Sequence, residues 1–149
     1  MKNSLTIYQE KNMSYDIIST RKRKTVKITY PIDIYNAIKR YGKNKQEQFI
    51  VITLNGIQEI IAIHIATIGL VNKTIIHPRE IFKFAYMDNA FAIAVAHNHP
   101  SGNLFPSSED IEITEQIIEV GKIMGIPVID HLVINKSNFY SLRQNGIIS

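Results

Sequence analysis

The run FAIAVAHNH, residues 91–99, constrains the fold more than any other stretch, because small and larger side chains alternate along it. Side chains two residues apart on a β-strand face the same side. One face of the predicted strand carries Phe91, Ile93, Val95, His97 and His99. The other face carries three alanines and an asparagine, which suits a closely packed helix. Both imidazoles therefore lie at the carboxyl end of a buried strand, where functional sites are common.

The hydrophobic pattern predicts further strands and helices around this strand. The expected elements are a helix over residues 30–42, paired strands over 48–55 and 57–69, a short strand before Pro78 and a helix after it, a long helix over 106–125, a strand over 126–135 and a short last element over 138–146. Because strands and helices are interspersed, we expect an α/β or α+β protein with a central mixed sheet flanked by helices.

Local signals mark where several of these elements begin and end. Gly42 is expected to stop the first helix, and the dipeptide Asn55-Gly56 to form the turn between the paired strands. Either Ser107 or Ser108 is expected to cap the long helix, which Gly125 ends.

Composition limits the class of protein. The chain has no cysteine, which excludes disulfides and thiolate metal sites and fits a reducing cytoplasm. Its longest apolar run, IIAIHIATIGLV, is interrupted by polar residues and is too short to span a bilayer. The N-terminal stretch lacks the apolar core of a secretion signal. We therefore expect a cytoplasmic protein with a basic extension over residues 1–29 and one domain over residues 30–149.

Positive charge is concentrated near the N-terminus. Residues 1–45 hold eleven of the 17 Lys and Arg residues and three of the 13 Asp and Glu residues. Much of the excess comes from the cluster Arg21, Lys22, Arg23 and Lys24. This cluster is a possible contact for nucleic-acid phosphates or another acidic partner. A run of charge is, however, more often a solvated loop.

Two neutral imidazoles and a carboxylate form a three-ligand set for Zn²⁺. The helix that starts near Ser108 brings Asp110 back in its first turn, toward the strand end that carries His97 and His99. Three protein ligands leave a fourth position for water, as in catalytic zinc sites. Bound zinc can lower the pKa of that water to about 7. The same set also suits Fe²⁺, so the pattern leaves the metal open.

The spacing H-x-H, seven residues, Ser107, two residues, Asp110 is that of the JAB/MPN/JAMM motif of metal-dependent isopeptidases and proteases. More closely, the segments HPREIF, AHNHPSGN, PSSEDIEIT and IPVIDHLVI resemble the RadC family of bacterial proteins. The resemblance runs from about Tyr30 to the last residue, with the segments in the family's order. It implies a JAB/MPN-like, cytidine-deaminase-like fold and zinc-dependent hydrolysis of a peptide or protein conjugate. It also implies a link with DNA repair.

The resemblance further implies a glutamate near the start of a strand as general base. Glu47 precedes the strand over residues 48–55, and it would pass a proton from the attacking water to the leaving amine. Glu80, which a helix dipole explains, and Glu59, which follows a turn, are the alternatives. By the same resemblance Ser107 would donate a hydrogen bond to the oxyanion. Its rival role is that of a plain helix cap.

The other histidines have simpler explanations. His77 is expected in a structural or surface role, and His131 as a hydrogen-bonded core residue, with contact to a metal ligand as the alternative. HNH nucleases, metallo-β-lactamases and cupins arrange their residues differently and are set aside. Three functions stay open: a metal-dependent hydrolase, a nucleic-acid-associated accessory protein, and an inactive metal-binding scaffold.

Overall fold

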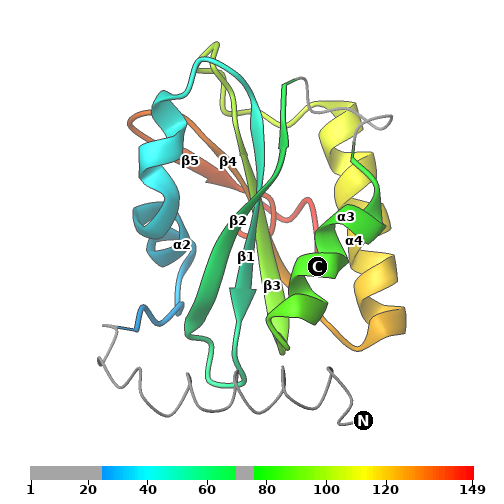
Figure 1. The fold of residues 1–149 in the computed structure, drawn as a ribbon. Helices are drawn as coiled ribbons and strands as arrows, with labels where there is room; N and C mark the ends of the chain where they lie inside the picture. The colour runs from blue at the N-terminus through cyan, green and yellow to red at the C-terminus, as the bar shows by residue number, and fades with distance from the viewer. Residues whose placement is uncertain (1–24, 70–75) are drawn as a thin grey trace, which may run out of the picture.

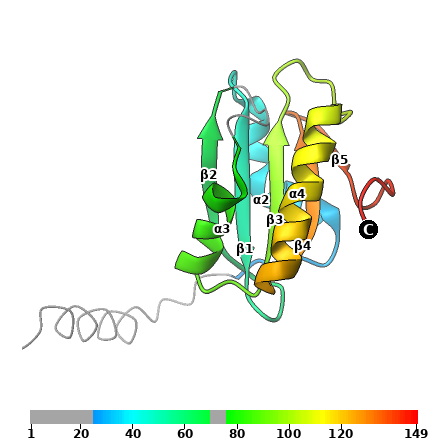
Figure 2. The same cartoon turned by 90° about the vertical axis from the view of Figure 1, so that its right-hand side faces the viewer.

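The computed structural model describes residues 25–69 and 76–149. Within them a five-stranded sheet separates α2 (Pro31–Ile38) from α3 (Pro78–Met87) and α4 (Ser108–Met124). Figure 1 shows α2 on one face of the sheet with α3 and α4 on the other, and Figure 2 shows α3 and α4 from the front. The expected α/β class, with a central mixed sheet flanked by helices, is confirmed.

The strands follow the spatial order β2-β1-β3-β4-β5. Their bounds are β1 (Gln48–Leu54), β2 (Ile60–Ile68), β3 (Ala92–Asn98), β4 (Val128–Ile134) and β5 (Phe139–Ser141). The pair β3 and β4 is parallel, and α4 connects the two strands, since a parallel pair needs a crossover. The other three pairs are antiparallel. The strand predicted from residues 91–99 is thus the middle strand, and all of β3 is buried.

The two faces of β3 pack against different helices. Its three alanines share a core cluster with Ile34 and Ile38 of α2. Ile93 and Val95 belong to a second cluster, formed with residues of α3 and α4. The small alanine side chains allow α2 to lie close to the sheet, as the alternation predicts.

The ends of α4 follow from its sequence. The Ser107 side chain accepts a hydrogen bond from the Asp110 backbone N, and the Asp110 carboxylate accepts one from the Ser107 backbone N. This reciprocal cap satisfies two donors at the helix start. Gly125 ends the helix in the left-handed conformation, with φ of 68°. Both predicted ends are confirmed, with Ser107 rather than Ser108 as the cap.

The prediction that Gly42 stops a helix is wrong. The chain continues from α2 into a 3₁₀ helix, η1 (Lys39–Lys43), and Gly42 lies inside it. A Cβ atom on Gly42 would lie 2.2 Å from the backbone oxygen of Asn135. The glycine therefore allows η1 to contact the turn between β4 and β5.

The turn between β1 and β2 also differs from the prediction. The Gln58 backbone N donates to the Asn55 backbone O at 3.0 Å, and Gln58 rather than Gly56 has a positive φ, of 64°. The Asn55 side chain accepts hydrogen bonds from the backbone N of Ile57 and Glu59. The dipeptide marks the reversal, but the asparagine side chain stabilises a longer turn.

The described part of the stretch before Pro78 is not a strand. Ile76 and His77 are irregular, and the residues from 70 to 75 lie outside the description. His77 caps α3, because its Nδ1 accepts a hydrogen bond from the Arg79 backbone N at 3.1 Å. The basic cluster at residues 21–24 likewise lies outside the described residues.

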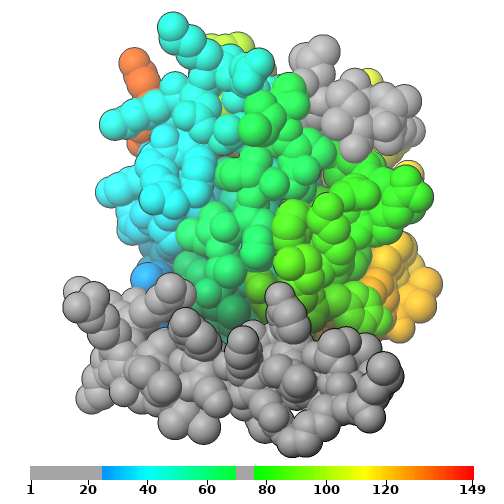
Figure 3. Space-filling model, in the orientation of Figure 1, coloured from blue at the N-terminus to red at the C-terminus, as the bar shows by residue number. Residues whose placement is uncertain are grey.

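One edge of the sheet is formed by β2, whose side chains are only partly buried. The space-filling view shows this strand in green between α2 in cyan and α3 in light green (Figure 3). Lys27 forms an isolated bridge with Glu59, and Ile28 is buried in the core, so these residues are joined to the domain. Among the described helices, none combines the length and the apolar character needed to cross a membrane.

Candidate metal centre

The candidate site lies at the carboxyl end of β3. His97 is the penultimate residue of this strand and is fully buried, whereas His99 follows the strand and is partly exposed. The His99 backbone N still donates to the Ile134 backbone O of β4 at 3.0 Å. The backbone therefore stays in line with the strand for one more residue, and the Nε2 atoms of the two imidazoles lie 2.9 Å apart.

Asp110 reaches the same point from the first turn of α4. Its Oδ1 lies 3.3 Å from His97 Nε2 and its Oδ2 lies 3.6 Å from His99 Nε2. The cap on Ser107 fixes the direction of this carboxylate, which is only 4% exposed. These three side chains could hold a metal ion, and no second set of three or more such groups occurs within residues 25–69 and 76–149.

The hydrogen bonds behind His97 have one possible direction, because they end at a carbonyl. Thr114 Oγ1 lies 2.5 Å from the Asp110 backbone O and donates its proton there. The same hydroxyl oxygen then accepts from His131 Nδ1 at 2.6 Å, which leaves Nε2 of a neutral His131 unprotonated. That Nε2 lies 2.8 Å from His97 Nδ1, which must donate. Neutral His97 therefore presents the lone pair of Nε2 to the site.

His99 is fixed in the same tautomer by a different partner. Its Nδ1 lies 2.5 Å from the Asn103 backbone O and donates to it. Two imidazole lone pairs and a carboxylate thus converge at separations of 2.9, 3.3 and 3.6 Å. Ligand atoms around a tetrahedral zinc with bonds of about 2.0–2.2 Å lie roughly 3.3–3.6 Å apart. The donor types and the two distances to Asp110 therefore fit zinc, whereas the two Nε2 atoms lie closer together than they would around a bound ion.

Burial and hydrogen bonds shift the pKa values of the site residues in opposite directions. Burial by itself raises the pKa of Asp110, but hydrogen bonds that His97 and His99 donate when their Nε2 atoms are protonated outweigh it and hold that pKa far below its usual range. The hydrogen bond that protonated His99 donates to Asp110 raises the pKa of His99, while burial lowers it. Burial lowers the pKa of His131 well below its usual value, which keeps this ring neutral as the hydrogen bonds require. A buried carboxylate that stays charged needs a positive partner, and a bound cation is one.

Of the three glutamates considered from the sequence, Glu47 lies beside the cluster. Its Oε1 is 4.0 Å from His99 Nε2, and its side chain is 22% exposed. Glu80 instead forms an ion pair with Lys83 within α3, and Glu59 accepts a hydrogen bond within the β1–β2 hairpin. The structure therefore brings together His97, His99, Asp110 and Glu47 and leaves the other two glutamates elsewhere.

Asn98, between the two histidines, holds the segment that carries Glu47. Its Oδ1 accepts from the Gln48 backbone N at 2.7 Å. Its Nδ2 donates to the backbone oxygens of Asn44 at 3.2 Å and Gln46 at 3.0 Å. The Asn98 side chain is fully buried, while its three partners lie in a partly exposed segment. The opposite face of β3 thus fixes the backbone on both sides of Glu47.

Ser107 lies at the start of α4, where its Oγ accepts from the Asp110 backbone N at 3.1 Å. A hydroxyl that accepts one hydrogen bond still has a proton to donate. The helix cap and a donor role toward a substrate are therefore compatible in the same side chain.

Two residues, His131 and Thr114, lie behind the cluster of candidate ligands. His131 is a satisfied core histidine and also contacts a candidate ligand, so both alternatives hold. Thr114 was not identified, although it follows Asp110 by four residues and therefore shares its helix face. His64, on which the sequence is silent, pairs with Asp88 at 2.6 Å.

Two cavities adjoin the loop that follows β3. One, of about 400 Å³, is lined by Glu47 and Gly69 among others. The second, of about 530 Å³, is lined by His99 among others. Lys45, Pro100 and Ser101 line both, so the two cavities lie on either side of one short segment.

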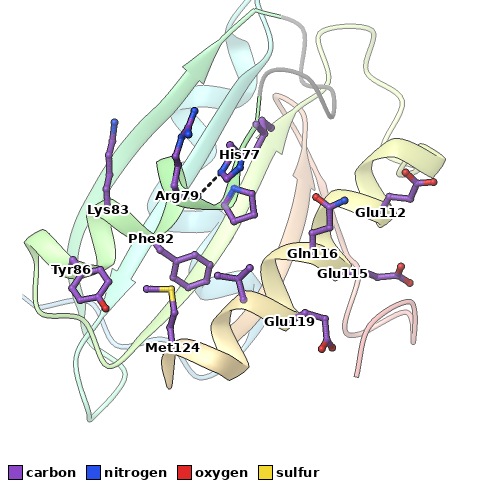
Figure 4. Close-up of a pocket in the computed structure, with 13 residues that line it drawn as sticks. His77, Arg79, Phe82, Lys83, Tyr86, Glu112, Glu115, Gln116, Glu119 and Met124 are labelled. Carbon is purple, nitrogen blue, oxygen red and sulfur yellow. Dashed lines mark hydrogen bonds between the residues drawn. The ribbon is translucent and has the colours of Figure 1, made fainter.

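A larger hollow of about 1090 Å³ lies between α3 and α4 (Figure 4). Phe82 and Met124 are among its apolar lining residues, Lys83 lies on the α3 side, and glutamates lie on the α4 side. None of the candidate ligands lines this groove. Among the residues that the structure describes, the one group that could hold a metal ion therefore lies at the end of β3, outside this groove.

Comparison with protein families gives a match over most of the chain. A family model described as RadC-like JAB domain matches residues 28–147. This range contains the whole described sheet, all three described α-helices and the four residues brought together at the end of β3.

Curated relatives extend beyond this chain. A "UPF0758 protein" of Methanospirillum hungatei is 45% identical over 130 residues, which cover 85% of this chain and 57% of the relative. A "UPF0758 protein" of Methanosarcina mazei is 38% identical over 123 residues, covering 82% and 54%. One of Caldanaerobacter subterraneus is 42% identical over 120 residues, covering 80% and 52%. The chain thus spans about half the length of these relatives.

Proposed function

The chain belongs to the RadC-like JAB domain family, and on that premise we propose that it is a zinc-dependent hydrolase that cleaves an amide bond in a peptide or protein conjugate. The observation that carries the proposal is the convergence of His97, His99 and Asp110, whose ligand atoms all lie within 4.8 Å of one another, with Glu47 beside them. A pure binding module has no need of a ligand set that leaves a coordination position open.

Zinc would be held by the Nε2 atoms of His97 and His99 and by the carboxylate of Asp110. A bound zinc ion supplies a Lewis acid for the scissile carbonyl and a water acidified to near-neutral pKa. The hydrogen bonds from His97 through His131 to Thr114 orient the first imidazole and fix its tautomer.

Glu47 would act as the general base. Its carboxylate would accept a proton from the attacking water and return it to the leaving amine, so that one group serves both halves of the reaction. Its partial exposure lets substrate approach, and the hydrogen bonds of Asn98 hold its backbone in place. Ser107 would donate its remaining hydroxyl proton to the oxyanion that develops on the scissile carbonyl.

The test compares metal content and hydrolysis in matched variants. Metal content is measured by mass spectrometry, and hydrolysis is followed on a defined pool of linear and lysine-branched peptides. We expect stoichiometric zinc in the wild type and in Glu47→Gln, and its loss in His97→Ala. Hydrolysis falls by roughly 10²-fold or more in Glu47→Gln, because the neutral amide cannot take a proton.

Glu80→Gln is the matched control, since it removes the same charge from an exposed ion pair of α3. It keeps both zinc and activity. Equal hydrolysis by zinc-loaded wild type and zinc-loaded Glu47→Gln would overturn the role of the base. It would leave a metal-binding scaffold as the better description.

A second candidate is a nucleic-acid-binding accessory protein, which the consecutive cations Arg21, Lys22, Arg23 and Lys24 favour. Binding of DNA that weakens steeply with salt would support it. The decisive pattern is binding that survives His97→Ala and disappears when the four cations are replaced by glutamine.

A further inference from the structure

The cavity beside His99 has an unusual set of charges. It lies between residues 42–45 at the end of η1, residues 99–102 after β3, and residues 135–137 in the turn between β4 and β5. These segments meet at the end of the sheet that is uppermost in Figure 1. The lining includes three lysines, Lys43, Lys45 and Lys136, and we call this space the lysine cavity.

Contacts between the three segments hold the walls of the lysine cavity together. Gly42 packs so closely on Asn135 that no side chain would fit between them. Asn135 Nδ2 donates to the Gly102 backbone O at 3.0 Å, which ties the turn to the loop after β3. The His99 backbone N donates to Ile134 at 3.0 Å. Close packing and hydrogen bonds therefore join the three segments that line the cavity. Each lysine side chain extends from a backbone that these contacts hold in place.

No carboxylate of the described lining balances the charge of the lysine cavity. The three lysines form no ion pair with the residues that the structure describes. By contrast, Lys83 and Lys122 each pair with a glutamate at 2.7 Å. Three like charges around one concavity repel each other, and a concave positive wall concentrates anions.

The lysine cavity adjoins the proposed reaction centre, because the candidate ligand His99 is part of its lining. It shares Lys45, Pro100 and Ser101 with the cavity that Glu47 lines. A chain bound across this segment would have its amide near Glu47 and a neighbouring group among the lysines. We propose that the substrate is an acidic peptide or conjugate, with a carboxylate near the scissile amide that binds in the lysine cavity. This inference rests on the proposed hydrolase function.

An acidic peptide fits this cavity better than a nucleic acid does. Nucleic-acid strands are bound along extended positive grooves with aromatic side chains for stacking. The lysine cavity is instead compact, at about 530 Å³, and its lining contains no Phe, Tyr or Trp among the described residues. A single carboxylate side chain or a chain terminus is sufficient to occupy it.

The test measures binding separately from hydrolysis. Fluorescence anisotropy compares a labelled decapeptide of alternating Gly and Glu with one of alternating Gly and Gln, on zinc-loaded and on metal-free protein. The cavity variant replaces Lys43, Lys45 and Lys136 by Gln. The control variant replaces Lys27, Lys83 and Lys122, so that both lose the same charge.

We expect the wild type and the control variant to prefer the Glu peptide, and the cavity variant to bind it about 10-fold more weakly, as three modest charge contacts would give. The difference persists in metal-free protein, so it stands or falls independently of zinc and hydrolysis. Equal affinity for the two peptides, or an equal loss in both variants, would overturn the inference. A labelled oligothymidylate that binds more tightly than the Glu peptide, and loses affinity in the cavity variant, would overturn it in favour of nucleic acid.

Discussion

At the residue scale, Thr114 decides which nitrogen of His97 carries the proton and so whether Nε2 can bind a metal. Its hydroxyl donates to the Asp110 carbonyl and therefore has to accept from His131. Without that acceptor, His131 has no reason to keep its proton on Nδ1. A proton moved to its Nε2 would face His97 Nδ1 and favour the tautomer of His97 that places N–H toward the site.

Thr114→Val is accordingly expected to weaken zinc binding by about 10- to 100-fold, the usual effect of losing a hydrogen bond behind a metal ligand. The variant keeps the shape of the side chain and leaves Nδ1 of the buried His131 without a hydrogen-bond partner. It therefore also lowers the free energy of unfolding of the metal-free protein by about 1–3 kcal/mol. Competition with a chelator measures the first effect and urea unfolding the second.

Thr114→Ser serves as the control, because it keeps the hydroxyl and loses one methyl group. It should bind zinc nearly as the wild type does. If Thr114→Val binds zinc with unchanged affinity, the tautomer of His97 does not depend on this chain of hydrogen bonds.

The sequence is informative about the ligand set because each part of it is local. Alternation along one strand places His97 near His99, and the capping rule places Asp110 in the first turn of a helix. The chain of hydrogen bonds behind them joins α4 to β4, and a contact between separate elements leaves no local pattern. His131 could therefore be weighed from the sequence, but its connection to Thr114 could not.

At the element scale, Gly42 marks where η1 meets the turn between β4 and β5. Its missing Cβ would lie 2.2 Å from a backbone oxygen, which has no flexible side chain to move aside. Gly42→Ala is expected to lower the free energy of unfolding by about 1–3 kcal/mol or more, the cost of overpacking. Urea unfolding measures this change.

Gly56→Ala is the matched control, because the nearest atom to its added Cβ is 4.0 Å away and its φ is not positive. We expect a change within about 0.5 kcal/mol, as for most surface substitutions. Equal stability of the two alanine variants would mean that η1 moves away from the turn at little cost.

Signals that lie within one element can be predicted from the sequence, whereas contacts between elements cannot. The hydrophobic pattern predicts strands β1 to β4, and the capping residues predict the ends of α4. The structure contains these elements where expected. Gly42 is predicted from the sequence only as a helix stop, and its close packing is revealed by its contact with Asn135. The turn after β1 depends on hydrogen bonds from the Asn55 side chain, which the Asn-Gly dipeptide alone does not reveal.

At the scale of the whole molecule, the sheet gathers segments that are far apart in the chain. β3 pairs with β1 on one side and with β4 on the other. Antiparallel pairing with β1 aligns Phe49 with His97, so Glu47, just before β1, lies beside His99, just after β3. The crossover through α4 brings Asp110 to the same end. A metal bound there would join the sheet to α4 and connect two layers of the fold.

Zinc is therefore expected to raise the melting temperature of the protein. A ligand at about 100 times its Kd stabilises the folded state by about 2.7 kcal/mol, which for a domain of this size corresponds to roughly 5–10 °C. Thermal unfolding with zinc and with chelator measures the difference. His97→Ala should abolish the shift, whereas His64→Ala, which alters a histidine paired with Asp88, should retain it. An equal shift in His97→Ala would place the stabilising ion elsewhere, because removing a fully buried ligand cannot leave that site intact.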